Sequence, residues 1–148
     1  MSSQAITEKN KETVRAFIDA LNRQDLAGLD ALLADDATWT VCAREIPAAG
    51  THEKKVVLGR ILPTMLAIFE PGEPRTEITR LIAEGDVVSA EAVSHGRLLH
   101  GAVYENRYSH VYEIRGDRIA AIREYTDTDY AAKIMAGAVE AGHTLDLG

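Results

Sequence analysis

The chain has 148 residues, of which 46% are hydrophobic and 26% are charged, values that are typical of one globular domain. Its formal net charge is -7 and its basic residues are scattered, which argues against nucleic acid as a partner. One cysteine, Cys42, excludes an internal disulfide and suits a reducing compartment. No apolar run is long enough to span a membrane, so we expect a cytoplasmic protein.

The N-terminal third predicts two helices. The first begins near Thr7 and carries apolar residues at the spacing of one helical face: Val14, Phe17, Ile18 and Leu21. Asp25 is suited to cap a second, shorter helix that carries leucines as far as Leu33.

A short strand is expected at 37–41, with Trp39 on its inner side, followed by a loop that holds Pro47 and Gly50. A third helix is expected to begin near His52 and to carry an apolar stripe: Leu58, Ile61, Leu62, Met65 and Phe69. Pro63 falls inside this stripe and predicts a kink, or a division into two short helices.

From Thr76 onward the apolar period changes to two, which is typical of strands. Four long strands joined by tight turns are predicted at 76–83, 87–99, 103–115 and 118–126. A last helix is expected at 128–135, and the tail 137–148 is expected to be loose.

Helices followed by a meander predict an α+β fold in one domain, residues 1–148, with its core at about 8–135. We expect three N-terminal helices packed on a curved antiparallel sheet. Such an arrangement makes a cone-shaped α+β barrel with an open mouth, and a small molecule is the partner that it suits.

The strand 103–115 carries an aromatic face that polar groups interrupt: Tyr104, Asn106, Tyr108, His110, Tyr112 and Ile114. Apolar walls with a few polar groups are typical of a ligand pocket. The alternative is a sealed core in which both polar residues are hydrogen-bonded.

The strand 87–97 has one face of small residues: Val88, Ala90, Ala92, Ser94 and Gly96. This row suits close packing of another sheet, which favours a homodimer. Glu91 and His95 lie on the other face, and they are either pocket residues or an inert pair at the rim.

On the last strand, alternation alone leaves the direction of Glu124 open. Facing inward, it would be a carboxylate among aromatic rings, where desolvation suits it to general acid–base work. Facing outward, it would pair with arginine at the surface. The sequence has no ligand set for a metal and no nucleotide motif, so we expect neither metal nor cofactor.

Two segments resemble SnoaL-like proteins of the nuclear transport factor 2-like superfamily. The first is NKETVRAFIDALNRQDLAGLDALLADDATWTV, at 10–41, and the second is YENRYSHVYEIRGDRIAAIREYTDT, at 104–128. AEAVSHG at 90–96 looks closest to the phenazine-biosynthesis A/B branch. The resemblance implies the fold, whereas the superfamily hosts many chemistries.

The resemblance also tests particular reactions. The position of the ketosteroid isomerase base falls on Val41, and that of its oxyanion-hole tyrosine on Phe17, so steroid-type isomerisation is disfavoured. The middle-strand pair of limonene-epoxide hydrolases aligns with Glu91 and Val93, which breaks that triad. Their last-strand acid aligns with Glu124, which favours the inward direction.

The sequence thus predicts a cofactor-independent acid–base enzyme, of cyclase, isomerase or hydrolase type, acting on a small apolar metabolite. Glu124 is the expected proton shuttle. His110, His95 and Tyr108 are expected to assist it. The expected substrate-binding residues are Phe17, Trp39, Met65, Glu91, Tyr104 and Asn106. His52 is either a guard of the mouth or a surface cap. The alternatives are a non-catalytic ligand-binding or dimerisation module and a protein-binding scaffold.

Overall fold

A computed structural model describes residues 2–147. Helices and strands follow one another in the chain as α1 (Ser3–Asn22), α2 (Leu26–Leu32), β1 (Leu33–Val41), β2 (Gly50–Glu53), α3 (Lys54–Val56), η1 (Val57–Ile61), α4 (Leu62–Leu66), β3 (Arg75–Glu84), β4 (Val87–Arg97), β5 (Val103–Arg115), β6 (Arg118–Thr126) and α5 (Thr128–Glu140). The predicted α+β fold is confirmed.

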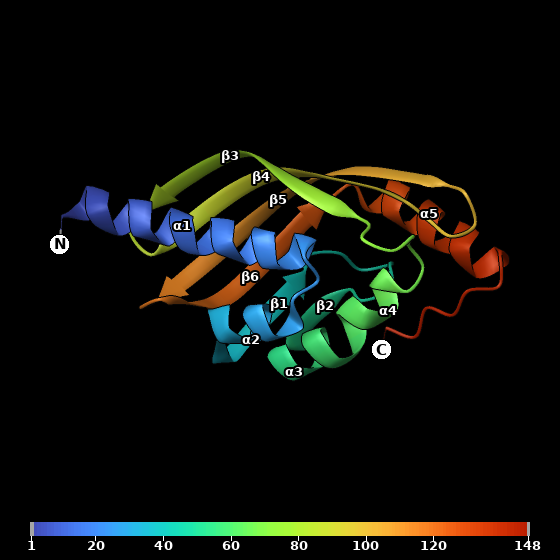
Figure 1. Cartoon of the computed structure of the whole chain (residues 1–148), viewed down its shortest axis with the longest axis horizontal. Coiled ribbons are helices and arrows are strands. Elements are labelled where there is room, and N and C mark those ends of the chain that lie inside the picture. Colours follow the sequence, from blue (N-terminus) through green and yellow to red (C-terminus); the bar gives the residue numbers. More distant parts are fainter. Residues whose placement is uncertain (1, 148) are drawn as a thin grey trace.

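The strands form one curved, unclosed sheet in the order β2-β1-β6-β5-β4-β3. Its pairs are antiparallel except β1 with β6, which run parallel, so the expectation of a wholly antiparallel sheet is wrong at that pair. Figure 1 shows α1 lying across one face of the sheet and α5 at one end of it. The C-terminal tail returns toward α4.

Helix α1 covers the sheet because one of its faces is apolar. Val14 and Phe17 are fully buried and pack with the inner residues of β4 and β5. The small residues Ala90 and Ala92 of β4 lie on this inner face and are buried. The row of small residues therefore packs inside the subunit, so the expectation that it packs against the sheet of a second copy is wrong.

The third helix differs from its prediction at both ends. His52 belongs to β2, an unpredicted strand that pairs with β1, and the helix begins at Lys54. Pro63 lies in the first turn of α4, directly after the π-helical turn η1. Since proline has no N–H, the backbone in front of it changes its hydrogen-bonding pattern, which accounts for the expected irregularity.

The tail 137–148 does not behave as expected over the residues that the structure describes. Helix α5 continues to Glu140, beyond the predicted end at 135. Leu147 is only 2% exposed and packs with Val57 and Ile61, and Arg60 forms an ion pair with Asp146. The expectation of a loose tail is therefore not met.

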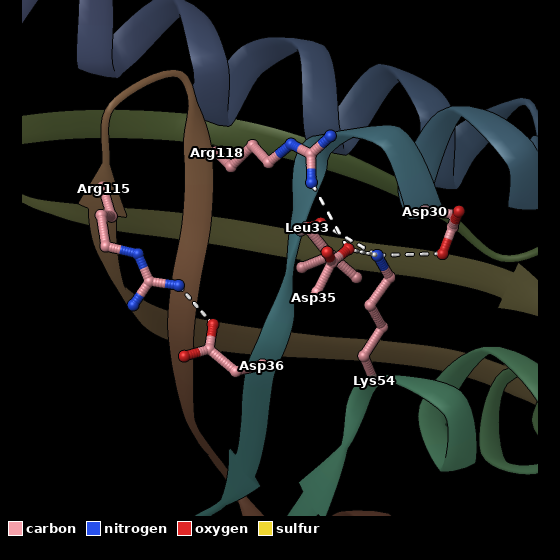
Figure 2. A network of polar contacts seen from close by, with 7 residues as sticks. All are labelled: Asp30, Leu33, Asp35, Asp36, Lys54, Arg115 and Arg118. Carbon is pink, nitrogen blue, oxygen red and sulfur yellow. Dashed lines mark hydrogen bonds and ion pairs between the residues drawn. The ribbon is translucent and has the colours of Figure 1, made fainter.

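A polar network fastens the helical layer to β1 (Figure 2). The Lys54 ammonium lies 3.0 Å from the Asp30 carboxylate and donates to the Leu33 carbonyl at 3.0 Å. Arg118 approaches Asp35 at 3.5 Å, and Arg115 pairs with Asp36. The Arg115 guanidinium lowers the pKa of the Asp36 carboxyl. The contacts of Lys54 with Asp30 and Leu33 hold the start of α3 against the end of α2.

Candidate functional site

An apolar cavity of about 210 Å³ lies between the concave face of the sheet and the helices. Its walls come from α1, β1, η1, α4 and α5. The apolar residues that define it include Ile18, Leu21, Trp39, Ile61, Leu62, Met65, Phe69, Ile134 and Met135. The cavity is below the roughly 300–1,000 Å³ of most ligand pockets, so it suits a molecule of one or two rings.

Two titratable groups on β5 and β6 open into this cavity. His110 and Glu124 are direct partners across the β5–β6 ladder. Their side chains are 7% and 19% exposed, and His110 Nε2 lies 3.5 Å from Glu124 Oε1. Both residues therefore lie on the inner face, where a ligand in the cavity reaches the carboxylate.

The direction of Glu124 depends on an irregularity in the last strand. The register of β5 with β6 shifts between Glu113 and Ile114, so Ile119 and Ile122 are both buried although they are three residues apart. Strict alternation over the whole strand is therefore wrong. From Ile122 onward the alternation is regular and turns Glu124 inward.

The surroundings of His110 restrict its hydrogen bonding. Nδ1 is buried and has no hydrogen-bond partner among residues 2–147. The ring is stacked on Tyr108 at a centroid distance of 5.2 Å. With its proton on Nε2, the imidazole points an N–H toward Glu124 and leaves only a lone pair unpaired at Nδ1. A proton on Nδ1 would bury an unpaired N–H, which costs more.

A chain of hydrogen bonds runs along β5 to the cavity. The Asn106 amide Nδ2 donates to the Tyr104 hydroxyl at 3.0 Å, and the Tyr104 and Tyr108 hydroxyls are hydrogen-bonded to each other. Either hydroxyl can be the donor in that bond. When Tyr104 donates to Tyr108, the Tyr108 proton is available to a ligand, and the chain ends in an O–H donor.

Burial keeps this donor protonated. Desolvation raises the pKa of Tyr108 well above its ordinary value, and Tyr104 and the Glu124 carboxylate raise it further. Desolvation likewise raises the pKa of Tyr104 and of Tyr112. The phenols therefore remain neutral donors in a cavity that holds a carboxylate.

Most of the predicted site residues meet in the cavity. The structure brings together Trp39, Met65, Tyr104, Tyr108, His110 and Glu124 along its walls. The predicted inner face of β5 is confirmed by burial, since Tyr104, Asn106, His110, Tyr112 and Ile114 are buried.

Four predicted site residues do not line the cavity. Glu91 and His95 are exposed on the outer face of β4, because the buried small residues of that strand occupy its inner face. Phe17 is fully buried in the core against Trp39 and Tyr112. Asn106 lies behind the wall, where it supports Tyr104.

His52 lines the cavity from β2, and its Nε2 lies 2.7 Å from the Ala48 carbonyl oxygen. It is neither at a helix start nor a surface cap. Helix α5 contributes Ile134 and Met135 to one side of the cavity, which was not predicted from the sequence. Their spacing with Ala131 and Ala138 is that of a helical face and was the available signal.

The charges along the cavity are unbalanced. Glu124 is its one carboxylate, and no lysine or arginine is found among its described lining residues. The same residues, 2–147, contain no cluster of three or more histidine, cysteine, aspartate or glutamate side chains arranged to hold a metal ion. An anionic ligand would therefore find no cationic partner.

The chain belongs to the SnoaL-like domain family, whose sequence profile matches residues 14–122. A search of curated proteins returns no match.

No helix within residues 2–147 is both long enough and apolar enough to span a membrane.

Solved structures share the fold. An NTF2-like protein from Burkholderia xenovorans LB400 is 27% identical, with a TM-score of 0.69 over 86% of this chain and 95% of that chain. TerC, crystallised with polyporic acid, is 17% identical, with a TM-score of 0.75 over 86% and 98%. A Xanthomonas campestris protein with a cystatin-like fold is 20% identical, with a TM-score of 0.72 over 83% and 95%. The last two likenesses show the fold alone.

Proposed function

We propose that this chain is a cofactor-independent acid–base enzyme whose substrate is a small, mostly apolar molecule bearing a carbonyl group. The observation that carries the proposal is the convergence of one carboxylate, Glu124, and one polarised phenol, Tyr108, in the same apolar cavity. Glu124 on β6 is paired with His110 on β5, and Tyr108 lies two residues from His110 on the same face of β5.

In the proposed mechanism Glu124 accepts a proton from the carbon next to the carbonyl. The imidazole of His110, whose Nε2 lies 3.5 Å from Glu124 Oε1, supports the carboxylate from that side, and Oε2 takes the proton of the substrate. Tyr108 donates its O–H to the carbonyl oxygen, on which negative charge develops. Return of the proton to a different atom gives an isomerase. Attack of the carbanion on a second carbonyl group of the same molecule forms a carbon–carbon bond and an alkoxide, which takes the proton from Glu124, and this gives a cyclase.

The magnitudes are adequate for such chemistry. A positioned general base contributes about 10²–10⁴-fold to a rate. Loss of one preorganised donor to a developing oxyanion costs about 10²–10³-fold. Both effects are strengthened in an apolar cavity, where water does not compete for the hydrogen bonds. A hydrolase is less well supported by these groups, since it also needs a positioned water.

The test uses 2-tetralone, a two-ring ketone with exchangeable α-hydrogens. Proton NMR in D₂O follows the exchange with wild type, with Glu124→Gln and with Glu91→Gln, a glutamate on the outer face of the sheet. We expect Glu124→Gln to slow protein-dependent exchange by at least about 100-fold and Glu91→Gln to leave it unchanged. Equal exchange in wild type and Glu124→Gln, with tetralone bound to both, would instead support a non-catalytic binding module.

A homodimer remains a prediction. The inner direction of the small residues removes one argument for it, and the surface left for a second copy is the outer face of β4, β5 and β6. This face carries Val103 and Tyr125, both about half exposed. Sedimentation equilibrium measures the mass directly, and a monomer at all concentrations contradicts the prediction.

A further inference from the structure

A second group of polar side chains lies at the end of the cavity away from Glu124. Thr76 on β3 and Ser94 on β4 are partners across the ladder and face the cavity. Asn22, near the end of α1, also lines it. The acid–base mechanism uses none of the three.

Ser94 has unused hydrogen-bonding capacity. The residue is 5% exposed, and its hydroxyl makes no hydrogen bond with any residue in the described part of the chain. Its oxygen is open to the cavity, since His110 Nδ1 is the one fully buried polar side-chain atom without a partner among residues 2–147. Because Ser94 lines the cavity, a ligand atom inside the cavity is positioned to supply that bond.

Asn22 is held in place by backbone bonds. Its Nδ2 donates to the Thr76 carbonyl at 2.8 Å, and its Oδ1 accepts from the Thr76 N–H at 2.7 Å. These two bonds fix the amide plane and leave one Nδ2 hydrogen for another acceptor. The end of the cavity therefore presents a rigid amide donor together with the Ser94 hydroxyl.

The spacing between the two polar ends sets the length of a ligand that reaches both. Ala90 is the β4 residue opposite His110, and Ser94 is four residues farther along the strand. Four residues of strand span roughly 13 Å, which is the backbone separation along the strand between the Glu124 end of the cavity and Ser94. Tyr108, opposite Ala92, lies between the two ends, so the length argument concerns Glu124 and Ser94 alone. Apolar side chains, among them Leu62, Met65 and Phe69, line the space between.

We propose that Ser94, with Asn22 and Thr76, forms a second polar subsite that binds a hydroxyl or carbonyl oxygen at the far end of the substrate. The ligand class is an uncharged, flat molecule of two rings with an oxygen function at each end. An uncharged group is favoured because no lysine or arginine lines the cavity over residues 2–147. The assignment rests on the proposed function only for the identity of the oxygen beside Glu124 and Tyr108.

The experiment compares 4,4′-dihydroxybiphenyl with 4-hydroxybiphenyl by isothermal titration calorimetry. The two probes differ only in the second hydroxyl. For wild type we expect the dihydroxy probe to bind about threefold to tenfold tighter, which is the gain from one hydrogen bond. Ser94→Ala should abolish this difference.

Two further variants serve as controls. Ser89→Ala changes a serine on the outer face of the same strand and should keep the wild-type difference. Ser94→Cys keeps nearly the size of the side chain but donates only weakly, so it should also abolish the affinity difference. It replaces Ser94→Ala in the test if the alanine variant is destabilised. Thermal unfolding of each variant confirms that it is folded.

The proposal is overturned if wild type gains nothing from the second hydroxyl, or if Ser94→Ala keeps the gain. Failure of the catalytic proposal is distinguishable, because these titrations measure affinity without turnover.

Discussion

His110 Nε2 lies 3.5 Å from Glu124 Oε1, while the other nitrogen of His110 is buried with no partner in residues 2–147. In the proposed mechanism this one-sided arrangement lets the imidazole position the carboxylate rather than act as a second proton shuttle. His110→Phe should therefore lower kcat for tetralone exchange about threefold to tenfold, the size of one modest polar interaction.

The same variant separates positioning from binding. KM should change little in His110→Phe, because the ring stack on Tyr108 is kept, and His110→Gln should recover part of the rate by restoring an N–H donor. A loss of rate as large as in Glu124→Gln would make His110 the proton acceptor instead.

Tyr108→Phe removes the donor at the end of the hydrogen-bond chain and keeps the ring. We expect kcat to fall about 10²-fold, as for other donors to a developing oxyanion. Tyr104→Phe removes polarisation but leaves the Tyr108 hydroxyl, so its effect should be smaller. Steady-state exchange rates measure both, and Tyr130→Phe, which alters a tyrosine outside the cavity, is the control. An equal fall of kcat in all three variants would contradict the proposal that Tyr108 is the last donor in the chain of hydrogen bonds.

Ionisation of the buried tyrosines should limit stability at high pH. In the unfolded chain a tyrosine has a pKa near 10.0, and in the fold burial raises the pKa of Tyr104, Tyr108 and Tyr112. Above that value the folded state binds more protons than the unfolded state, so stability falls as pH rises. The contribution is fully present below pH 10 and is lost through the higher pKa of the folded state.

Denaturant unfolding at about pH 9 and about pH 11 measures this loss. Tyr112→Phe keeps the buried ring but removes one ionisable group, so the fall in the free energy of unfolding between the two pH values should be smaller than in wild type. Tyrosinate absorbance of the folded protein should lag behind that of the unfolded chain. An identical fall in both proteins contradicts the assignment.

Lys54→Gln should destabilise the fold by about 1 kcal/mol, because it removes a charged hydrogen bond to the Leu33 carbonyl and an ion pair with Asp30. The Lys54 side chain is 12% exposed, so water only partly replaces these contacts. Its neighbour Lys55 is 84% exposed, and Lys55→Gln should change stability by less than about 0.5 kcal/mol. Urea unfolding of the pair gives the comparison, and equal losses would contradict a stabilising role for the Lys54 contacts shown in Figure 2.

Gly96→Ala should cost about 1–3 kcal/mol of unfolding free energy, since overpacking forces the backbone to shift. A Cβ at Gly96 would lie 2.8 Å from Pro74 Cα, which is too close for an ordinary contact. Gly59→Ala is the matched control, because a Cβ there meets nothing within 4 Å. A neutral Gly96→Ala variant would mean that the segment before β3 moves freely.

Local pattern was sufficient for most of the elements, though not for β2, and for one face of the site. Alternation along 103–115 predicts which residues of β5 share a face, because side chains in a strand point to opposite sides with a period of two. The mixture of tyrosine, asparagine and histidine there identifies that face as a pocket wall. The sequence predicts Glu124 as the acid, a role that stays a prediction; alternation did not decide its direction, and the family resemblance favoured the inward one.

Tertiary packing decided the rest. Burial of Ala90 and Ala92 beneath α1 turns Glu91 and His95 outward, and a register shift between β5 and β6 determines which residues of the last strand face inward. The parallel pairing of β1 with β6 places Val41 beside Glu124. Such choices depend on contacts between residues far apart in the chain, whose free energies no local pattern contains, whereas the period of each strand is set by its own backbone geometry.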